Sequence, residues 1–229
     1  MALPPKNVSM YAKLTLESLA AHHLGDKLSL GGAFGLLHYL DYRPTYDVDA
    51  WWMPATTAAE QEAVLTIIEN TLSPFGQIRR RAWGDVVSIE LHPDQQAVFS
   101  FQIARRSAQL QPSTSAEWTD VLLDSLVDLI ASKMVALVER GAPRDFRDIY
   151  EVCRAQLTTP VQCWQWWEQR QHLTGSDMDR HRARLAIETH LVRISQHRPL
   201  EHIEDPAQRT AAQQVREWFL TEFLDALSD

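Results

Sequence analysis

Hydrophobic and polar positions divide the chain into a first half of mixed patterns and a helical second half. Apolar residues three and four positions apart predict helices over residues 9–24, 33–40 and 57–72. Short apolar or alternating runs predict strands over residues 28–30, 46–53, 77–83, 85–91 and 97–104. Beyond residue 117 the pattern is helical, with almost no strand signal. The order predicts the α+β (α/β) class, with an α/β half followed by an all-helical half.

A polar stretch marks the expected boundary between the two halves. Residues 108–116 read AQLQPSTSA, and this content of Ser, Gln and Pro is typical of a linker. A long helical pattern follows over residues 121–139 and is broken by Gly141, Ala142 and Pro143. We therefore expect a core domain, 1–115, and a helical domain, 116–229.

Length and composition are ordinary for a soluble globular protein. With 229 residues, 45% of them apolar and 23% charged, the chain can bury a sizeable core. It has no apolar run of about 18 residues and no signal-peptide pattern, so we expect no membrane span and a cytoplasmic location. Two cysteines, Cys153 and Cys163, without a secretion signal argue against a disulfide framework.

The charge balance leaves the binding partner open. A formal net charge of −8 argues against broad nonspecific adhesion to nucleic acid. Two local basic clusters stand out, one at Arg79, Arg80 and Arg81 and the other at Arg105 and Arg106. They are interpreted either as contacts to an RNA backbone or as strand-edge arginines that discourage edge pairing.

Two aspartates flank Val48 on the strand predicted over residues 46–53. Because side chains alternate faces along a strand, Asp47 and Asp49 are expected on the same side of the sheet. Adjacent carboxylates repel each other unless a cation lies between them, and Mg²⁺ (magnesium) is the natural candidate. The plainer interpretation is a half-exposed strand with alternating polar residues.

A glycine pair precedes this strand. Gly31 and Gly32 lie where a predicted strand meets a predicted helix, and exposed backbone N–H groups at such a junction suit a phosphate. A simple tight turn is the alternative for the pair alone. Strand, glycine pair, helix and aspartate strand together are more specific, and they predict a nucleoside triphosphate held at the glycines with its metal at the aspartates.

Lys133 lies within the apolar stripe of a predicted helix. Ile130, Met134 and Leu137 belong to that stripe, and Lys133 is three residues after the first and four before the last. An ammonium group there must either reach out to solvent or meet an anion. The anion of interest is a triphosphate.

The next predicted helix opens with Arg144, Asp145 and Asp148. Asp145 in the first turn complements the helix dipole, and the spacing allows a surface pair between Arg144 and Asp148. The spacing alone does not demand catalysis.

Two stretches in this order resemble a known family. They are LGGAFGLLHYLDYRPTYDVDAWW and, much later, DLIASKMVALVERGAPRDFRDIYEV. Together they resemble the AbiEii/AbiGii-type nucleotidyltransferases of the DNA polymerase β-like superfamily, over roughly residues 28–152. The resemblance implies a polymerase β-like core with a mixed sheet and a helical C-terminal half. Asp47 and Asp49 match its metal ligands, and Gly31 and Gly32 match its phosphate-side turn.

The resemblance also implies roles in the second block and a cellular function. Lys133 matches the lysine of the third motif, which contacts the nucleoside triphosphate (NTP), and Asp148 matches the aspartate of the fourth, with Arg144 and Asp145 beside it. Family members are typically toxins of bacterial toxin–antitoxin or abortive-infection pairs. Several resemble enzymes that add nucleotides to the 3′ end of tRNA, and the usual partner is a winged-helix antitoxin. Alternatives are a small-molecule or protein acceptor, or a catalytically silent binding module.

One departure concerns a third carboxylate, which the wider superfamily often carries on a later strand. The matching strand here offers Ser100 and Gln102, and the nearest acidic strand residue is Glu90. Either Glu90 serves, or the metal site is incomplete, or Asp148 takes part of the role. The glycine pair also stands where many relatives outside this family have Gly-Ser, which removes one hydroxyl contact.

Aromatic and histidine residues add little chemistry. Trp164, Trp166 and Trp167 are interpreted as helix core rather than as a stacking surface for bases. The histidines show no metal-ligand spacing that would indicate zinc.

Overall fold

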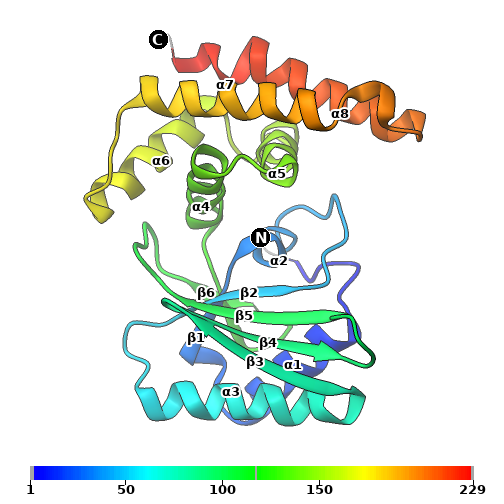
Figure 1. The fold of residues 1–229 in the computed structure, drawn as a ribbon. Coiled ribbons are helices and arrows are strands. Elements are labelled where there is room, and N and C mark those ends of the chain that lie inside the picture. Colours follow the sequence, from blue (N-terminus) through cyan, green and yellow to red (C-terminus); the bar gives the residue numbers. More distant parts are fainter. Residues whose placement is uncertain (1–2, 117, 228–229) are drawn as a thin grey trace. The chain divides into compact units, whose positions relative to one another are not determined.

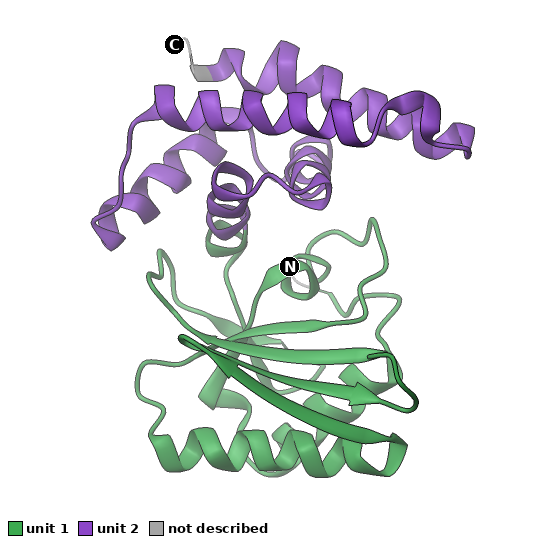
Figure 2. Ribbon diagram, viewed as in Figure 1, with its two compact units in different colours: residues 1–129 green, residues 130–229 purple. Residues whose placement is uncertain are grey.

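The computed structural model describes residues 3–116 and 118–227, and contacts divide the chain into two compact units. Unit 1 is residues 1–129 and unit 2 is residues 130–229 (Figure 2). Helix α4 (Leu126–Glu139) crosses this division. The other elements of unit 1 are α1 (Met10–Ala21), β1 (Leu28–Leu30), α2 (Gly32–Leu36), β2 (Val48–Trp52), α3 (Ala58–Leu72), β3 (Gln77–Trp83), β4 (Val86–His92), β5 (Phe99–Arg105), β6 (Thr114–Ala116) and β7 (Val121–Leu123). Those of unit 2 are α5 (Pro143–Arg154), α6 (Pro160–Thr174), α7 (Arg180–His197) and α8 (Pro206–Trp218).

Shorter turns of helix complete the described chain. They are 3₁₀ turns at Gly25–Lys27, Ser73–Phe75, Leu200–His202 and Asp225–Leu227 and a π-helical turn at Phe219–Phe223. No helix among the described residues is both long and apolar enough to cross a membrane.

The described strands of unit 1 form a seven-stranded sheet in the order β3-β4-β5-β2-β1-β7-β6 (Figure 1). β2 is parallel to β5 and β1 is parallel to β7, whereas the other neighbours are antiparallel. This mixed sheet, followed by helices, confirms the predicted α+β class.

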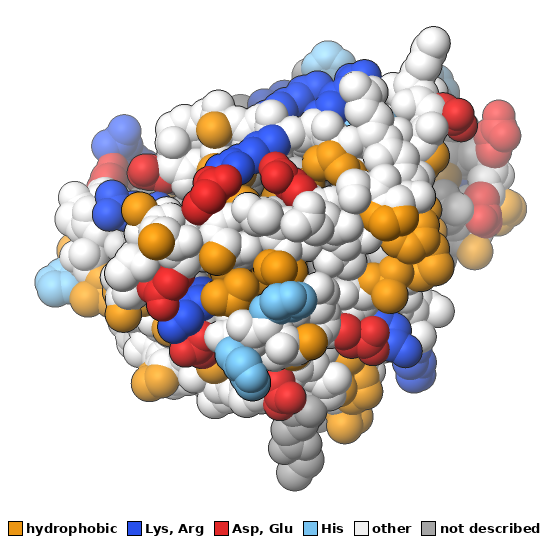
Figure 3. Space-filling view, turned by 90° about the horizontal axis from the view of Figure 1, so that it is seen from below, with side chains coloured by type: hydrophobic (Ala, Val, Ile, Leu, Met, Phe, Trp, Pro, Cys, Tyr) orange, Lys and Arg blue, Asp and Glu red, His pale blue; other side chains and the backbone are white. Residues whose placement is uncertain are grey.

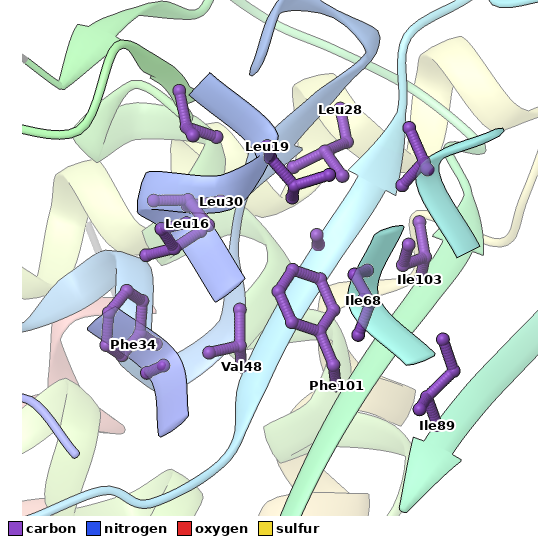
Figure 4. Close-up of a cluster of buried hydrophobic side chains, with 14 of the residues drawn as sticks. Leu16, Leu19, Leu28, Leu30, Phe34, Val48, Ile68, Ile89, Phe101 and Ile103 are labelled. Carbon is purple, nitrogen blue, oxygen red and sulfur yellow. The ribbon is translucent and has the colours of Figure 1, made fainter. Parts of the chain in front are cut away.

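Helices α1 and α3 cover one face of the sheet and form the core of unit 1 with it (Figure 1). Leu16 and Leu19 of α1 and Ile68 of α3 meet Phe101 and Ile103 of β5, and each of these side chains is fully buried (Figure 4). Burying one such side chain stabilises the fold by about 1.5–3 kcal/mol. Since side chains alternate along a strand, the polar residues of the same strands project to the opposite face.

Seen from the side of α3, charges of both signs alternate with apolar side chains (Figure 3). At this helix Arg80 of the edge strand β3 pairs with Glu62 at 2.7 Å, and Lys27 pairs with Glu60 at 3.0 Å. Such exposed pairs contribute about 0–1 kcal/mol each. Arg80 is therefore a strand-edge arginine, as one of the two interpretations of its cluster predicts.

The helix predicted over residues 121–139 is wrong at its start. Val121 and Leu123 are buried in β7, which pairs with β1 in parallel, and α4 begins only at Leu126. A short apolar run does not distinguish a strand from a buried helix, and here pairing with β1 and β6 on either side makes the run a strand.

The stretch predicted as a linker is held by unit 1. The Asp128 carboxylate accepts hydrogen bonds from the backbone N–H groups of Leu110 and Gln111 at 2.7 and 2.9 Å. Thr114–Ala116 then joins the sheet as β6. The compact units divide at residues 129 and 130, later in the chain than the predicted boundary at 115 and 116.

Aromatic side chains form the core of unit 2. Trp164 and Trp167 of α6 are only 1% and 2% exposed, and Trp164 lies against Phe223 with ring centroids 5.5 Å apart. Phe146 of α5 meets Phe219 edge to face at 4.7 Å. The core interpretation of Trp164 and Trp167 is therefore confirmed.

Candidate functional site

The glycine pair forms the turn between β1 and α2. The Gly31 N–H donates to the Asp49 carbonyl oxygen at 2.8 Å, which fastens the turn to β2. Gly32 has a φ of +55°, in the left-handed region that favours glycine. Helix α2 begins at Gly32 and is five residues long, shorter than the predicted range of residues 33–40.

Both glycines lie directly against side chains of the aspartate strand. A Cβ on Gly32 would lie 2.0 Å from Asp49 Oδ2, and a Cβ on Gly31 would lie 2.3 Å from Trp51 Nε1. A side chain at either position would displace the Asp49 or Trp51 side chain. The structure thus brings together three of the predicted site residues, Gly31, Gly32 and Asp49.

Asp47 lies one residue before β2, where it is held by the neighbouring strand. Its Oδ1 accepts the Ser100 N–H at 3.1 Å, and its side chain is exposed. Asp49 is in β2 and partly buried, while Val48 between them is fully buried on the core side. Both carboxylates therefore belong to the face opposite α1 and α3.

The donors around this point suit magnesium. Mg²⁺ binds one or two carboxylates and completes its octahedral shell with water and substrate phosphates. Asp47 and Asp49 supply two carboxylates, and Gln102 stands beside Asp49 in the register of β2 and β5. The described residues contain no cluster of three or more His, Cys, Asp or Glu side chains suited to a metal. Two carboxylates fit a cation whose remaining ligands are water and substrate phosphates.

Glu90 lies on β4, which is separated from the aspartate strand β2 by β5. It pairs with Ser100 on the middle strand β5, so it is two strands away from β2, or about 10 Å at the usual strand spacing. Its carboxylate contacts His92 at 3.1 Å and Arg81 at 3.6 Å. In this arrangement Glu90 is bound to its own strand neighbours.

The register also places two arginines on the face of the aspartates. Arg79 is opposite Glu90 and Arg81 is opposite Ser88 in the pairing of β3 and β4. Ser88 is in turn opposite Gln102, which neighbours Asp49. Both arginines are exposed, so they form the cationic edge of a polar row that ends at the aspartates.

Arg106 belongs to a buried network, contrary to both interpretations of its basic cluster. Its guanidinium pairs with Asp124 and donates to Ser29 Oγ at 2.5 Å, and its side chain is 5% exposed. Ser29 donates to Asp124 Oδ1 at 2.8 Å. The Arg106 guanidinium also lies 5.9 Å from the ring centre of Trp51, the side chain that covers Gly31. Sequence reasoning missed this support of the glycine turn, because the partners are far apart in the chain.

His38, shortly after α2, is buried in a neutral form. Trp118 Nε1–H donates to His38 Nε2 at 3.0 Å, so Nδ1 carries the proton and faces the Phe34 carbonyl oxygen at 2.9 Å. Burial lowers the pKa of His38 below its ordinary value of 6.5.

Acidification is expected to destabilise the fold through His38. Below about pH 6.5 the unfolded chain binds a proton that the folded imidazole does not, so the free energy of unfolding falls with pH by at most about 1.4 kcal/mol per unit. The loss continues until the pH reaches the lower folded pKa. Denaturant unfolding between pH 7.5 and about 5 measures it, with His38→Gln as reference. The difference in the free energy of unfolding between the unaltered protein and His38→Gln should become smaller as the pH falls. A difference that stays the same at every pH would contradict the prediction.

Unit 2 holds the second group of predicted residues. Lys133 Nζ lies 2.7 Å from Asp148 Oδ2 and 3.8 Å from Asp145 Oδ1, and both aspartates are fully buried. Arg140 completes the group with two hydrogen bonds to Asp145 at 2.8 and 2.9 Å. Two cations therefore meet two carboxylates, which is how buried charges become tolerable.

The local sequence explains why these side chains meet. Gly141 has a φ of +52° and lies against the ring of His190, so the chain turns sharply between α4 and α5. Pro143 occupies the first turn of α5 and lacks the N–H that a helix start would leave unpaired. Arg144 is exposed, whereas Asp148 is buried and pairs with Lys133 rather than lying at the surface.

Comparison with known proteins identifies a family over most of the chain. The family described as "Nucleotidyl transferase AbiEii toxin, Type IV TA system" matches residues 14–222. No curated protein matches the sequence significantly. The matched range includes the glycine turn with Asp47 and Asp49, and also Lys133 with its buried aspartates.

Proposed function

The chain belongs to the AbiEii nucleotidyl transferase toxin family, and from this premise we propose that it transfers NMP from an NTP to the 3′ end of tRNA. The family makes it a nucleotidyl transferase and the toxin of a type IV toxin–antitoxin system. The donor, the acceptor, the metal and the residue roles are our proposal. A winged-helix protein is the proposed antitoxin, and the cytoplasm, which holds NTPs and tRNA, is the proposed compartment.

The close contact between the glycine turn and the Asp49 side chain is the observation that carries the proposal. A Cβ at Gly32 would collide with the Asp49 carboxylate at 2.0 Å, so backbone and carboxylate share one small volume. This closeness is what a metal-bound triphosphate needs, because its phosphates approach bare backbone while carboxylates hold the cation. A tight turn with a solvated strand would not require it.

Each residue receives a role from its chemistry. Asp47 and Asp49 hold Mg²⁺, and Gly31 and Gly32 allow the phosphates to approach the backbone. A bound magnesium ion supplies positive charge to the phosphates in the transition state. Lys133 is proposed to bind the outer phosphates as a point charge, together with Arg144.

Asp148 is proposed as a positioning residue. The 2.7 Å contact between Lys133 Nζ and Asp148 Oδ2 supports the orientation of the ammonium by this carboxylate, rather than a role for Asp148 in binding the acceptor. The proposed reaction is an in-line displacement. An acceptor hydroxyl oxygen bonds to the α-phosphorus and loses its proton, while the bond to the β-phosphate oxygen breaks and pyrophosphate leaves.

The acceptor is proposed to cross β3 on the face of the aspartates. Arg79 and Arg81 are exposed there, and phosphate contacts from arginine orient a nucleic acid without reading its sequence. Trp83, which is 50% exposed, follows the same alternation and offers a stacking surface for a base.

The test of this function is direct labelling. Purified protein is incubated with Mg²⁺, total tRNA and each α-labelled NTP in turn, beside an Asp47→Ala variant. Label on tRNA with the unaltered protein alone would support the proposal and identify the NTP. Label on a protein or small molecule instead would replace the tRNA acceptor, and neither transfer nor NTP binding would favour a catalytically silent module.

Gly32→Ala is expected to lower transfer by about 10²-fold, since displacing a reacting group by about 1 Å has this effect. The new Cβ would push the Asp49 carboxylate away. Gly84→Ala is the matched control, because Gly84 has a φ of +54° and no described atom within 4 Å of its added Cβ. Both variants place alanine at nearly the same positive φ, so equal activity of the two would contradict the role of the Gly32–Asp49 contact.

Replacing Arg79 and Arg81 with glutamine is expected to weaken tRNA binding, with a smaller dependence of affinity on salt than in the unaltered protein. NTP binding should stay unchanged, because these side chains lie on the edge strand β3. Titration of tRNA at several salt concentrations measures the effect. Arg80→Gln is the control, since Arg80 points to the α3 face and pairs with Glu62. An equal loss in that control would assign the effect to net charge.

A further inference from the structure

The two cysteines of the chain lie against each other in unit 2. Cys153 is in the last turn of α5 and Cys163 is in the first turns of α6, and their sulfur atoms are 3.8 Å apart. Both thiols are free. The contact joins two helices that are linked by only a short connection, and its chemistry lies beyond nucleotidyl transfer.

The two thiols differ in access. Cys153 is partly exposed and lines a pocket of about 460 Å³, together with Thr158 and Trp218. Cys163 is fully buried, and its hydrogen bond with Cys153 and its burial raise the pKa of its thiol well above the ordinary value. A reagent in the pocket therefore meets Cys153, while Cys163 lies behind it as a protonated thiol.

We propose that Cys153 and Cys163 are a reversible disulfide site, which a hydroperoxide such as hydrogen peroxide oxidises through the pocket. The Cys153 thiolate attacks one peroxide oxygen, the O–O bond breaks, and Cys153 becomes a sulfenic acid while the released hydroxide takes up the thiol proton as water. The Cys163 sulfur then bonds to the Cys153 sulfur, and the sulfenic hydroxyl leaves with the Cys163 proton as a second water. Two thiols are oxidised by two electrons, and one peroxide is reduced to two waters.

The two sulfur atoms are already in contact in the reduced protein. A disulfide needs a sulfur–sulfur distance of about 2.05 Å, and the present 3.8 Å is the contact distance of two reduced sulfurs. The bridge would tie the end of α5 to α6, and α5 also carries Asp145 and Asp148.

The experiment treats the full chain with hydrogen peroxide at neutral pH, then denatures it, alkylates remaining thiols and measures the intact mass. After oxidation the unaltered chain should take up no alkylating reagent, and its mass should be lower by two hydrogen atoms. If a thiol reductant is added before alkylation, both of its cysteines should be alkylated. Digestion without reductant should give a single peptide pair joined through Cys153 and Cys163. Dimedone, which traps sulfenic acids, should label Cys163→Ala at Cys153 but not the unaltered chain.

Two variants make the order of events testable. In Cys153→Ala the remaining Cys163 should stay a thiol after the same treatment, because it is fully buried. Dimedone labelling of the unaltered chain equal to that of Cys163→Ala would overturn the proposal, and so would disulfides that form only between chains. If Cys163→Ala does not fold, the joined peptide of the unaltered chain still decides the question.

Discussion

Replacing Asp47 and Asp49 together with asparagine is expected to lower nucleotidyl transfer by at least on the order of 10³-fold while the fold keeps its stability. The two carboxylates repel each other when no cation is present, so removing both charges relieves a cost in the folded state. The asparagine that replaces Asp47 would still offer an oxygen to the Ser100 N–H, which Asp47 Oδ1 now accepts at 3.1 Å. Activity and stability should therefore separate.

The separation distinguishes a metal site from a solvated strand. Transfer is measured with labelled NTP over a range of Mg²⁺ concentrations, and unfolding is followed with denaturant on the same samples. Asp85→Asn with Asp94→Asn is the matched control, because both residues are exposed and the pair removes the same charge from unit 1. Full activity of the Asp47 and Asp49 variant would overturn the metal role, and a large loss of stability would assign the two residues to the fold.

The sequence predicted the parts of this site that depend on local pattern. The strand over residues 28–30, the glycine turn and the aspartate strand are each encoded within a few residues, and the structure joins Gly31 to Asp49 by a backbone hydrogen bond. The position of Lys133 within an apolar stripe predicted that its ammonium group must either reach solvent or meet an anion. The structure supplies Asp148 as the compensating group at 2.7 Å.

Features that depend on partners far apart in the chain could not be predicted from the sequence. Val121 and Leu123 fit a helix or a strand equally well, and they become a strand only by pairing with β6 and with β1, which lies nearly a hundred positions earlier in the chain. Arg106 looked like a surface cation because Arg105 precedes it. Its burial follows from Asp124 and Ser29, whose closeness is a product of the sheet order.

Glu90 shows the same limit for the site. Alternation along β4 predicts its face, whereas its distance from the aspartates depends on β5 lying between β4 and β2. Strand order is set by long-range packing, and no periodicity within one strand encodes it. The sequence could therefore offer Glu90 as a third carboxylate, and the structure shows it bound to His92 and Arg81.

Lys133→Met is expected to destabilise unit 2 by about 3–5 kcal/mol, because it removes one partner of a buried ion pair. It is also expected to abolish transfer, because Lys133 is the proposed phosphate-binding cation. Asp148 is fully buried and only 9% of the Lys133 side chain is exposed, so water has little access to replace the ammonium group. Adding Asp148→Leu to this variant should recover part of the stability, since an apolar pair can replace a buried ion pair. Activity should not return, because the ammonium group that we propose to bind the phosphates is still missing.

Denaturant unfolding and NTP binding of the single and double variants measure the two effects separately. Lys13→Met is the matched control, because Lys13 also pairs with an acidic residue on a helix, Glu17 at 3.8 Å, but with 61% of its side chain exposed. This control should change stability by about 1 kcal/mol or less and leave activity intact. If the double variant regained stability and activity together, Lys133 would be a structural lysine and the phosphates would need another cation. If stability alone returned, the ammonium group itself would be what the reaction requires.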